Sequence, residues 1–324
     1  MYGNNLVPLM PISTDDQSTT PTSRRFLVRI VEFETQKRRR ATGKRYMWKN
    51  IFVFLALVSY PTLAQVVSGS ILIFNVTKDE LIVAADSLAE NHDTGIPDYS
   101  NCKISAFGHQ LIFTSVGNTG MSRAGVILWQ STDLAKDAVH SARKTKDGTI
   151  DASDAIFHWA QNVKGRWDLE DRAVARKAAM INNWQLTSGA FVGKGFDTEL
   201  AVVSFDDAKL IDPIEYHFGH ISDINTCWRC GQLGKNQICG AGRHLDVAAK
   251  FCSERKHRDR IKIRTHLRGA SESTKLAIKI VEMTIDQYGE TAKDVGGVVD
   301  SITTTKTGRL TWNARKENCP ENQD

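Results

Sequence analysis

The sequence lacks a hydrophobic run long enough to cross a membrane. Its apolar stretch Ile51–Val58 has eight residues, whereas a spanning helix needs about 20. Basic residues at 44, 45 and 49 precede this stretch, and small residues at 61–65 follow it where signal peptidase would cut. We therefore expect residues 47–64 to be an export signal, with no stable membrane span. The alternative is a buried strand or helix of the mature domain.

The body of the chain also lacks an excess of either charge. The formal net charge is +5, but ten of the 42 Lys and Arg and only four of the 37 Asp and Glu precede Gln65. The remainder carries 32 basic and 33 acidic side chains, which gives no charge-based reason to expect nucleic-acid binding. Residues 1–46 show no sustained periodicity, and we interpret them as disordered or as an upstream extension of the signal.

There is no second Cys-x-x-Cys pair beside Cys227–Cys230, and no internal repeat. Structural disulfides are therefore favoured over zinc, redox chemistry or free thiols for these cysteines, although all four remain open. All six cysteines follow the predicted signal, and an even number in an exported chain indicates one to three disulfides of unknown pairing. Candidate disulfide cysteines are Cys227, Cys230, Cys239 and Cys252. We predict no metal and no cofactor.

The sequence does contain a clear order of predicted strands and helices. Two apolar runs, 71–76 and 81–85, flank a four-residue turn and predict a β-hairpin. A second pair of strands follows, and then a long helical stretch that is broken twice. The further predicted elements are strands at 103–107 and 110–116, helical segments within 121–183, strands at 188–192, 200–205 and 216–218, helices at 242–251 and 271–288, and strands at 295–303 and 309–312.

This order of elements predicts an α+β fold. Two antiparallel sheets can each bury one face against the other and the second face under helices. We therefore expect a four-layer αββα sandwich over residues 65–315, followed by a tail at 316–324.

The first third of this domain resembles the β-type proteasome subunits of the N-terminal nucleophile (Ntn) hydrolase family. The resemblance is carried by Gly69-Ser70, by Asp86 sixteen positions after Ser70, by Lys103 seventeen positions later, and by Gly117 after an apolar strand. In that family, chain cleavage after a glycine exposes a hydroxyl residue as the new N-terminus. Weaker similarity extends to about residue 313.

The resemblance implies a catalytic role for several residues. Ser70 would be the nucleophile, and its free α-amine, with an ordinary pKa of about 7.7–8.0, would act as the base. Lys103 would add positive potential, and Asp86 would hold Lys103 charged and oriented. Gly117 would leave the backbone open to a substrate chain, and Gly240 would offer an N–H to the oxyanion.

Each of these residues also has a purely structural interpretation. Asp86 can stabilise a turn, Lys103 can be a solvated lysine at a strand end, and Ser70 can be an ordinary strand residue of an uncut chain. Gly240 can serve as a helix-entry glycine.

The sequence departs from the family at several accessory positions. Serine is replaced by Ala241 and by Val295, and aspartate by Ala292, while the nucleophile is serine where threonine is usual. The interval from Asp86 to Lys103 is one residue longer than in the family.

We therefore expect an exported hydrolase of peptide or amide bonds, periplasmic or secreted, with a homo-oligomer compatible with the resemblance. The alternative is a non-catalytic protein of the same fold that acts in assembly or binding.

Overall fold

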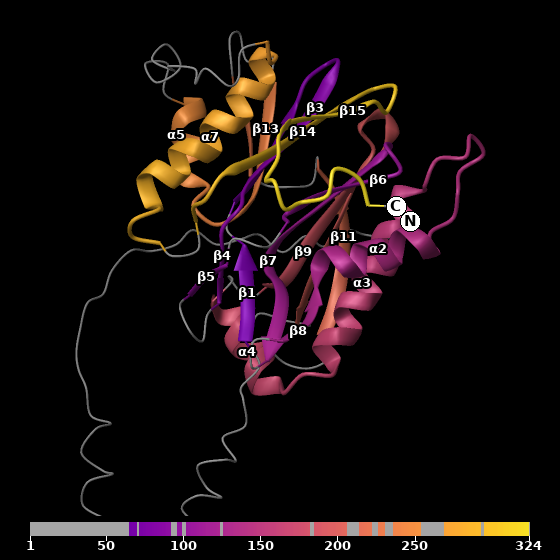
Figure 1. Ribbon diagram of the computed structural model, residues 1–324, viewed down its shortest axis with the longest axis vertical. Helices are drawn as coiled ribbons and strands as arrows, with labels where there is room; N and C mark the ends of the chain where they lie inside the picture. Colours follow the sequence, from indigo (N-terminus) through magenta and orange to yellow (C-terminus); the bar gives the residue numbers. More distant parts are fainter. Residues whose placement is uncertain are drawn as a thin grey trace, which may run out of the picture. The chain divides into compact units, whose positions relative to one another are not determined.

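Two antiparallel sheets lie face to face in the computed structural model (Figure 1). The structure describes residues 65–69, 71–91, 96–98, 102–123, 126–181, 185–205, 214–221, 226–230, 236–253, 269–292 and 295–323, all within the unit Thr62–Asp324. Among the predicted features, residues 1–46, the signal 47–64 and Ser70 lie outside the described residues.

The first sheet comprises β1 (Gln65–Gly69), β4 (Ala89–Asn91), β5 (Ile96–Asp98), β6 (Ile104–Phe107), β7 (Leu111–Arg123), β8 (Val126–Gln130), β9 (Gln185–Val192), β10 (Thr198–Phe205) and β11 (Ile214–His220). The second comprises β2 (Ile71–Val76), β3 (Glu80–Asp86), β12 (Cys227–Cys230), β13 (Asn236–Gly242), β14 (Val299–Thr305) and β15 (Leu310–Ala314).

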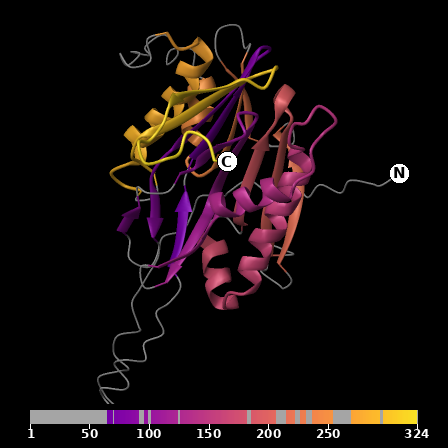
Figure 2. The ribbon, with the colours of Figure 1, turned by 45° about the vertical axis from the view of Figure 1, so that its right-hand side comes forward.

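Helices cover the outer face of each sheet, as Figures 1 and 2 show. One apolar cluster joins the first sheet to α2 (Ser131–Ser141), α3 (Ala152–Asp168) and α4 (Arg172–Ile181). Another joins the second sheet to α5 (Asp246–Ser253) and α7 (Glu272–Tyr288). A third cluster lies between the two sheets. Three clusters between four layers confirm the predicted α+β sandwich.

The first hairpin shows how the sequence specifies these layers. Along β2, Ile71 and Ile73 face the helix-side cluster, whereas Leu72 and Phe74 face the other sheet. Successive side chains of a strand point to opposite faces, so a strand that is buried on both sides reads as one continuous apolar run. The predicted hairpin is confirmed, with β2 paired to β3.

The helical predictions are confirmed from Ser131 to Ile181, as α2, α3 and α4, and near the C-terminus. Asp151 caps α3 by accepting the N–H groups of Ser153 and Asp154. The predicted helix 271–288 is α7, which Ser271 caps by accepting the N–H of Thr274, and it ends at Tyr288 before Gly289.

The prediction of helix from residue 121 is wrong for its first ten residues. The strand β7 continues to Arg123, and β8 pairs with it, so that Met121 lies opposite Trp129. Both of these side chains are buried, and their pairing outweighs the helical spacing of the nearby apolar residues. The second break of the helical stretch, expected between Gly165 and Asp171, lies after Asp168, where α3 ends, and the third helix Arg172–Ile181 follows as predicted.

Two glycines of this region test the packing of the helix-side layer. A Cβ at Gly189 would lie 2.5–2.8 Å from the Trp159 ring, whereas a Cβ at Gly165 would meet nothing within 4 Å. We expect Gly189→Ala to lower the free energy of unfolding by about 1–3 kcal/mol through overpacking. Its control, Gly165→Ala, should raise it by about 0.5–1 kcal/mol. Urea denaturation measures both, and a Gly189→Ala protein as stable as the wild type would contradict the packing described.

Candidate active site

A fully buried ion pair connects the two sheets. Asp86 is the last residue of β3, Lys103 immediately precedes β6, and the Lys103 Nζ lies 2.6 Å from the Asp86 Oδ1. Both side chains have no solvent exposure. Burying two charges is costly unless the pair is close and its remaining hydrogen-bonding capacity is used.

Backbone N–H groups supply that remaining capacity. Ile71 donates its N–H to Asp86 Oδ1 at 3.2 Å, and Gly296 donates its N–H to Asp86 Oδ2 at 3.1 Å. Both carboxylate oxygens therefore accept charge-assisted hydrogen bonds, which fix the carboxylate and through it the lysine. The solvated strand-end alternative for Lys103 is therefore wrong.

This pair lies next to the predicted cleavage point. Ile71, which donates to Asp86, directly follows Ser70, and Gly69 directly precedes it. Gly69 is paired with Gly117 of β7 on one side and with Ala89 of β4 on the other. The predicted residues Asp86, Lys103 and Gly117 are therefore brought around the two residues that flank Ser70.

Gly240 is not available in the way that the resemblance implies. Its N–H donates to the carbonyl of Thr226 at 3.1 Å, and a Cβ at this position would lie 2.5 Å from Leu245 Cδ2. Close packing explains the glycine without an oxyanion role.

The accessory positions that depart from the family belong to apolar clusters. Val295 is buried with Ala292 beside it in the cluster under α5 and α7, and Ala241 packs against the cluster between the sheets. Gly296, the residue after Val295, donates its N–H to the Asp86 carboxylate of the ion pair.

Sequence reasoning missed a second buried acid near the pair. Asp300 of β14 is 2% exposed and accepts the N–H of Lys316 at 2.7 Å. Burial raises the pKa of Asp300, and the positive charges of Lys316 and Lys103 act against that rise. The sequence does carry a sign of this buried acid. Asp300 is the one charged residue of the strand Val299–Thr305, whose other residues are apolar or carry hydroxyl groups.

All six cysteines form disulfides. Cys227 pairs with Cys239 and Cys230 pairs with Cys252, so the two cysteines of the Cys-x-x-Cys pair bind different partners. The zinc, redox and free-thiol alternatives for these residues are therefore wrong in this structure, and Cys227–Cys230 forms the strand β12. The third disulfide, Cys102–Cys319, adjoins Lys103.

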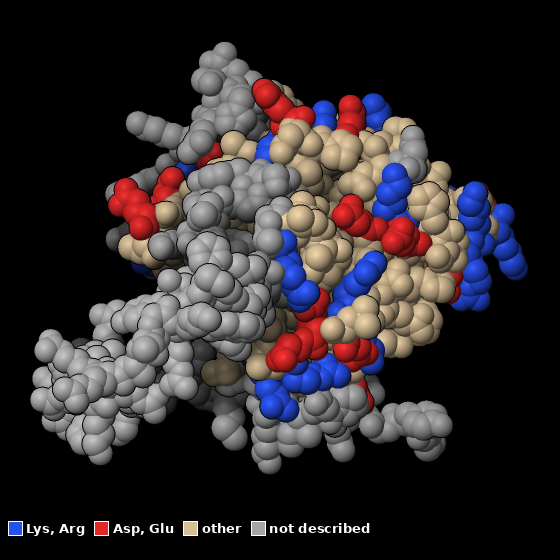
Figure 3. All heavy atoms as spheres, turned by 60° about the horizontal axis from the view of Figure 1, so that its bottom comes forward, with Lys and Arg blue, Asp and Glu red and all other residues tan. Residues whose placement is uncertain are grey.

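On the face shown in Figure 3, acidic and basic side chains of the described residues are interspersed, and neither charge dominates. Within the described part of the chain, no helix combines the length and apolar character needed to cross a bilayer.

No family model matches this chain, and no curated protein matches it. Solved structures that are similar to it include Anbu from Hyphomicrobium sp. strain MC1, with 15% identity and a TM-score of 0.38, covering 76% of this chain and 89% of that one. A Gly-1 mutant of the same protein has 14% identity and a TM-score of 0.37, and the alignment covers 79% and 89% of the respective chains.

Proposed function

We propose that this protein is an N-terminal nucleophile hydrolase that cleaves peptide or amide bonds with Ser70 after the chain is cut between Gly69 and Ser70. One observation carries the proposal. The buried carboxylate of Asp86 binds both the Lys103 ammonium, at 2.6 Å, and the N–H of Ile71, the residue next to Ser70, at 3.2 Å.

The chemistry follows from these contacts. The Ser70 hydroxyl would attack the substrate carbonyl and transfer its proton to the α-amine of the same residue. The amine of the leaving group would take up that proton as the tetrahedral intermediate collapses, and water would hydrolyse the resulting ester. The buried Lys103 charge would stabilise the negative charge that develops on oxygen, and Asp86 keeps that charge in place.

The strand before Ser70 supports an extended peptide as the substrate. In the uncut chain, β1 is paired on one side with β4 and on the other with β7 (Figure 1). Removal of Gln65–Gly69 would leave two strand edges with unpaired backbone groups, which bind extended peptides by strand addition. Gly117 lies opposite Gly69, the residue whose carbonyl belongs to the bond to be cut.

Export is part of the proposal. Three disulfides in one domain are typical of oxidising compartments, which supports a periplasmic or secreted protein.

A non-catalytic role is the second candidate. It is favoured by the paired position of β1 in the uncut chain and by the engaged N–H of Gly240. A protein of this kind would keep Gln65–Gly69 as a permanent strand of the first sheet.

Intact-mass measurement of the exported full-length gene product distinguishes the two. We expect a mature chain that begins at Ser70 and reacts with an electrophile directed at nucleophilic hydroxyls. Cleavage before Ser70 would proceed by attack of the Ser70 hydroxyl on the Gly69 carbonyl, with the bond to the Ser70 nitrogen broken and water hydrolysing the resulting ester. Ser70→Ala should therefore retain residues 65–69 and remain unlabelled, whereas the control Ser68→Ala should be cut and labelled like the wild type. A mature wild-type chain that begins at Gln65 would refute the mechanism and favour the second candidate.

A further inference from the structure

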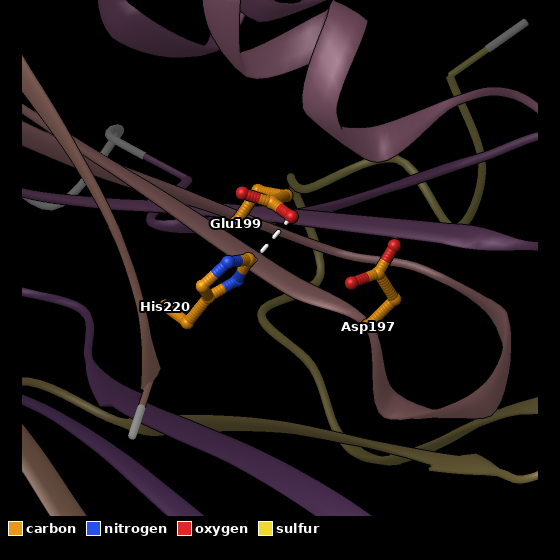
Figure 4. A group of neighbouring side chains, drawn as sticks. All are labelled: Asp197, Glu199 and His220. Atoms are coloured by element: carbon orange, nitrogen blue, oxygen red, sulfur yellow. Dashed lines mark ion pairs between the residues drawn. The ribbon is translucent and has the colours of Figure 1, made fainter. Parts of the chain in front are cut away.

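A second group of chemically competent side chains lies away from the ion pair, at the β10–β11 edge of the first sheet. Asp197, Glu199 and His220 each offer one ligand atom, and these atoms all lie within 4.8 Å of one another. Figure 4 shows the three side chains converging from the start of β10 and the end of β11. Neither the resemblance nor the proposed hydrolysis uses them.

Strand pairing brings two of the three together. Glu199 and His220 are direct partners in the β10–β11 register, and the His220 Nδ1 lies 3.3 Å from the Glu199 Oε1. The Glu199 side chain is 13% exposed and that of His220 is 60% exposed. Cross-strand partners of this kind are held on one face of the sheet, so the paired atoms face the same solvent-accessible space.

The third side chain is placed by a tight turn. Asp197 precedes β10 and lies two residues before Glu199, a spacing that puts both carboxylates on one face. Its carbonyl accepts the N–H of Gly193 at 2.6 Å, and the turn in between contains Gly195 and Phe196, both with positive φ. The backbone under the cluster is therefore fixed, while the side chain of Asp197 is exposed.

We propose that Asp197, Glu199 and His220 form a binding site for a divalent transition cation such as zinc. One imidazole nitrogen and two carboxylate oxygens suit zinc or manganese better than calcium or magnesium, which prefer oxygen ligands alone. Three protein ligands leave further coordination positions for water.

The distances agree with this assignment. Zinc binds nitrogen and oxygen at about 2.0–2.2 Å, so two ligand atoms on one tetrahedral ion are separated by roughly 3.3–3.6 Å. The Glu199–His220 distance of 3.3 Å already meets that value. The Asp197 oxygen lies within 4.8 Å of the others, and a side-chain rotation brings it to bonding distance. The cation would neutralise two neighbouring carboxylates and tie the edge strand β11 to the turn before β10.

Zinc binding by the full-length purified protein tests the site. After removal of metal with a chelator, equilibrium dialysis against zinc alone should give one ion per chain, and the melting temperature should rise with zinc concentration. We expect Asp197→Asn and His220→Gln each to weaken zinc binding at least roughly tenfold and to abolish the thermal shift.

His217→Gln is the matched control. His217 is an exposed histidine of the same strand, and its spacing of three residues from His220 puts it on the opposite face. This variant should bind zinc like the wild type. The proposal is overturned if the wild type binds no zinc, if His220→Gln binds as tightly as the wild type, or if His217→Gln loses as much affinity as His220→Gln. Circular dichroism of the metal-free variants checks that each is folded, and Ser70→Ala should bind zinc normally whether or not Ser70 is a nucleophile.

Discussion

Asp86→Asn is expected to lower the free energy of unfolding by about 3–5 kcal/mol and to prevent cleavage before Ser70. The substitution leaves the Lys103 ammonium fully buried without its partner at 2.6 Å, and an uncompensated buried charge is strongly destabilising. It also weakens the acceptor for the N–H of Ile71. Urea denaturation measures the first effect, and intact mass measures the second.

A double variant separates stability from chemistry. In Asp86→Asn/Lys103→Met both charges are gone, and replacing a whole buried pair by neutral groups is often close to neutral for stability. We expect stability to return to near the wild-type value while cleavage and electrophile labelling remain absent. Recovery of labelling in this variant would show that the pair has only a structural role.

A surface pair provides the control for the stability measurement. Lys194 and Asp147 are 2.7 Å apart, as close as the buried pair, but their side chains are 48% and 49% exposed. Asp147→Asn should therefore change the free energy of unfolding by less than about 1 kcal/mol. An effect as large as that of Asp86→Asn would contradict the role given to burial.

Local sequence pattern was sufficient for much of the fold. Neighbouring residues determine the continuous apolar runs of β2 and β3 and the end of α7 before Gly289. Periodicity was insufficient where a strand is selected by a distant partner. The register of Met121 with Trp129 and the strand Cys227–Cys230 depend on pairing that no local window contains.

The residues of the candidate site were likewise predictable only where local spacing points to them. Spacing within residues 69–117 indicated Asp86, Lys103 and Gly117, because it agrees with the family to within one residue. Asp300, the Glu199–His220 pair and the disulfide partner of Cys102 come from chain segments far apart or from strand register. Only the folded sheets bring them together, so their roles could not be read from order along the chain.

Removing the Cys102–Cys319 disulfide is expected to destabilise the protein by up to about 5 kcal/mol. The two cysteines are 217 residues apart in the sequence, and the entropy that a cross-link removes from the unfolded chain grows with the length of the closed loop. Cys227–Cys239 spans only 12 residues, so its loss should cost about 3 kcal/mol. The double alanine variants of the two disulfides form a matched pair for urea denaturation under non-reducing conditions.

The Cys102–Cys319 disulfide should also affect Lys103, because Cys102 is its neighbour in the chain. The segment that follows Cys319 is bound to the first sheet, where Gln323 donates its N–H to the carbonyl of Ala106 at 2.8 Å and its Nε2 to Ser105 Oγ at 3.0 Å. Without the disulfide, the covalent tie between the tail and the residue before Lys103 is lost, and neutral hydrogen bonds such as these are worth only about 1 kcal/mol each. We therefore expect Cys102→Ala/Cys319→Ala to slow cleavage before Ser70, whereas Cys227→Ala/Cys239→Ala should lower stability and leave that rate unchanged at a temperature where both variants are folded. Equal rates in the two variants would show that the tail stabilises the domain without positioning Lys103.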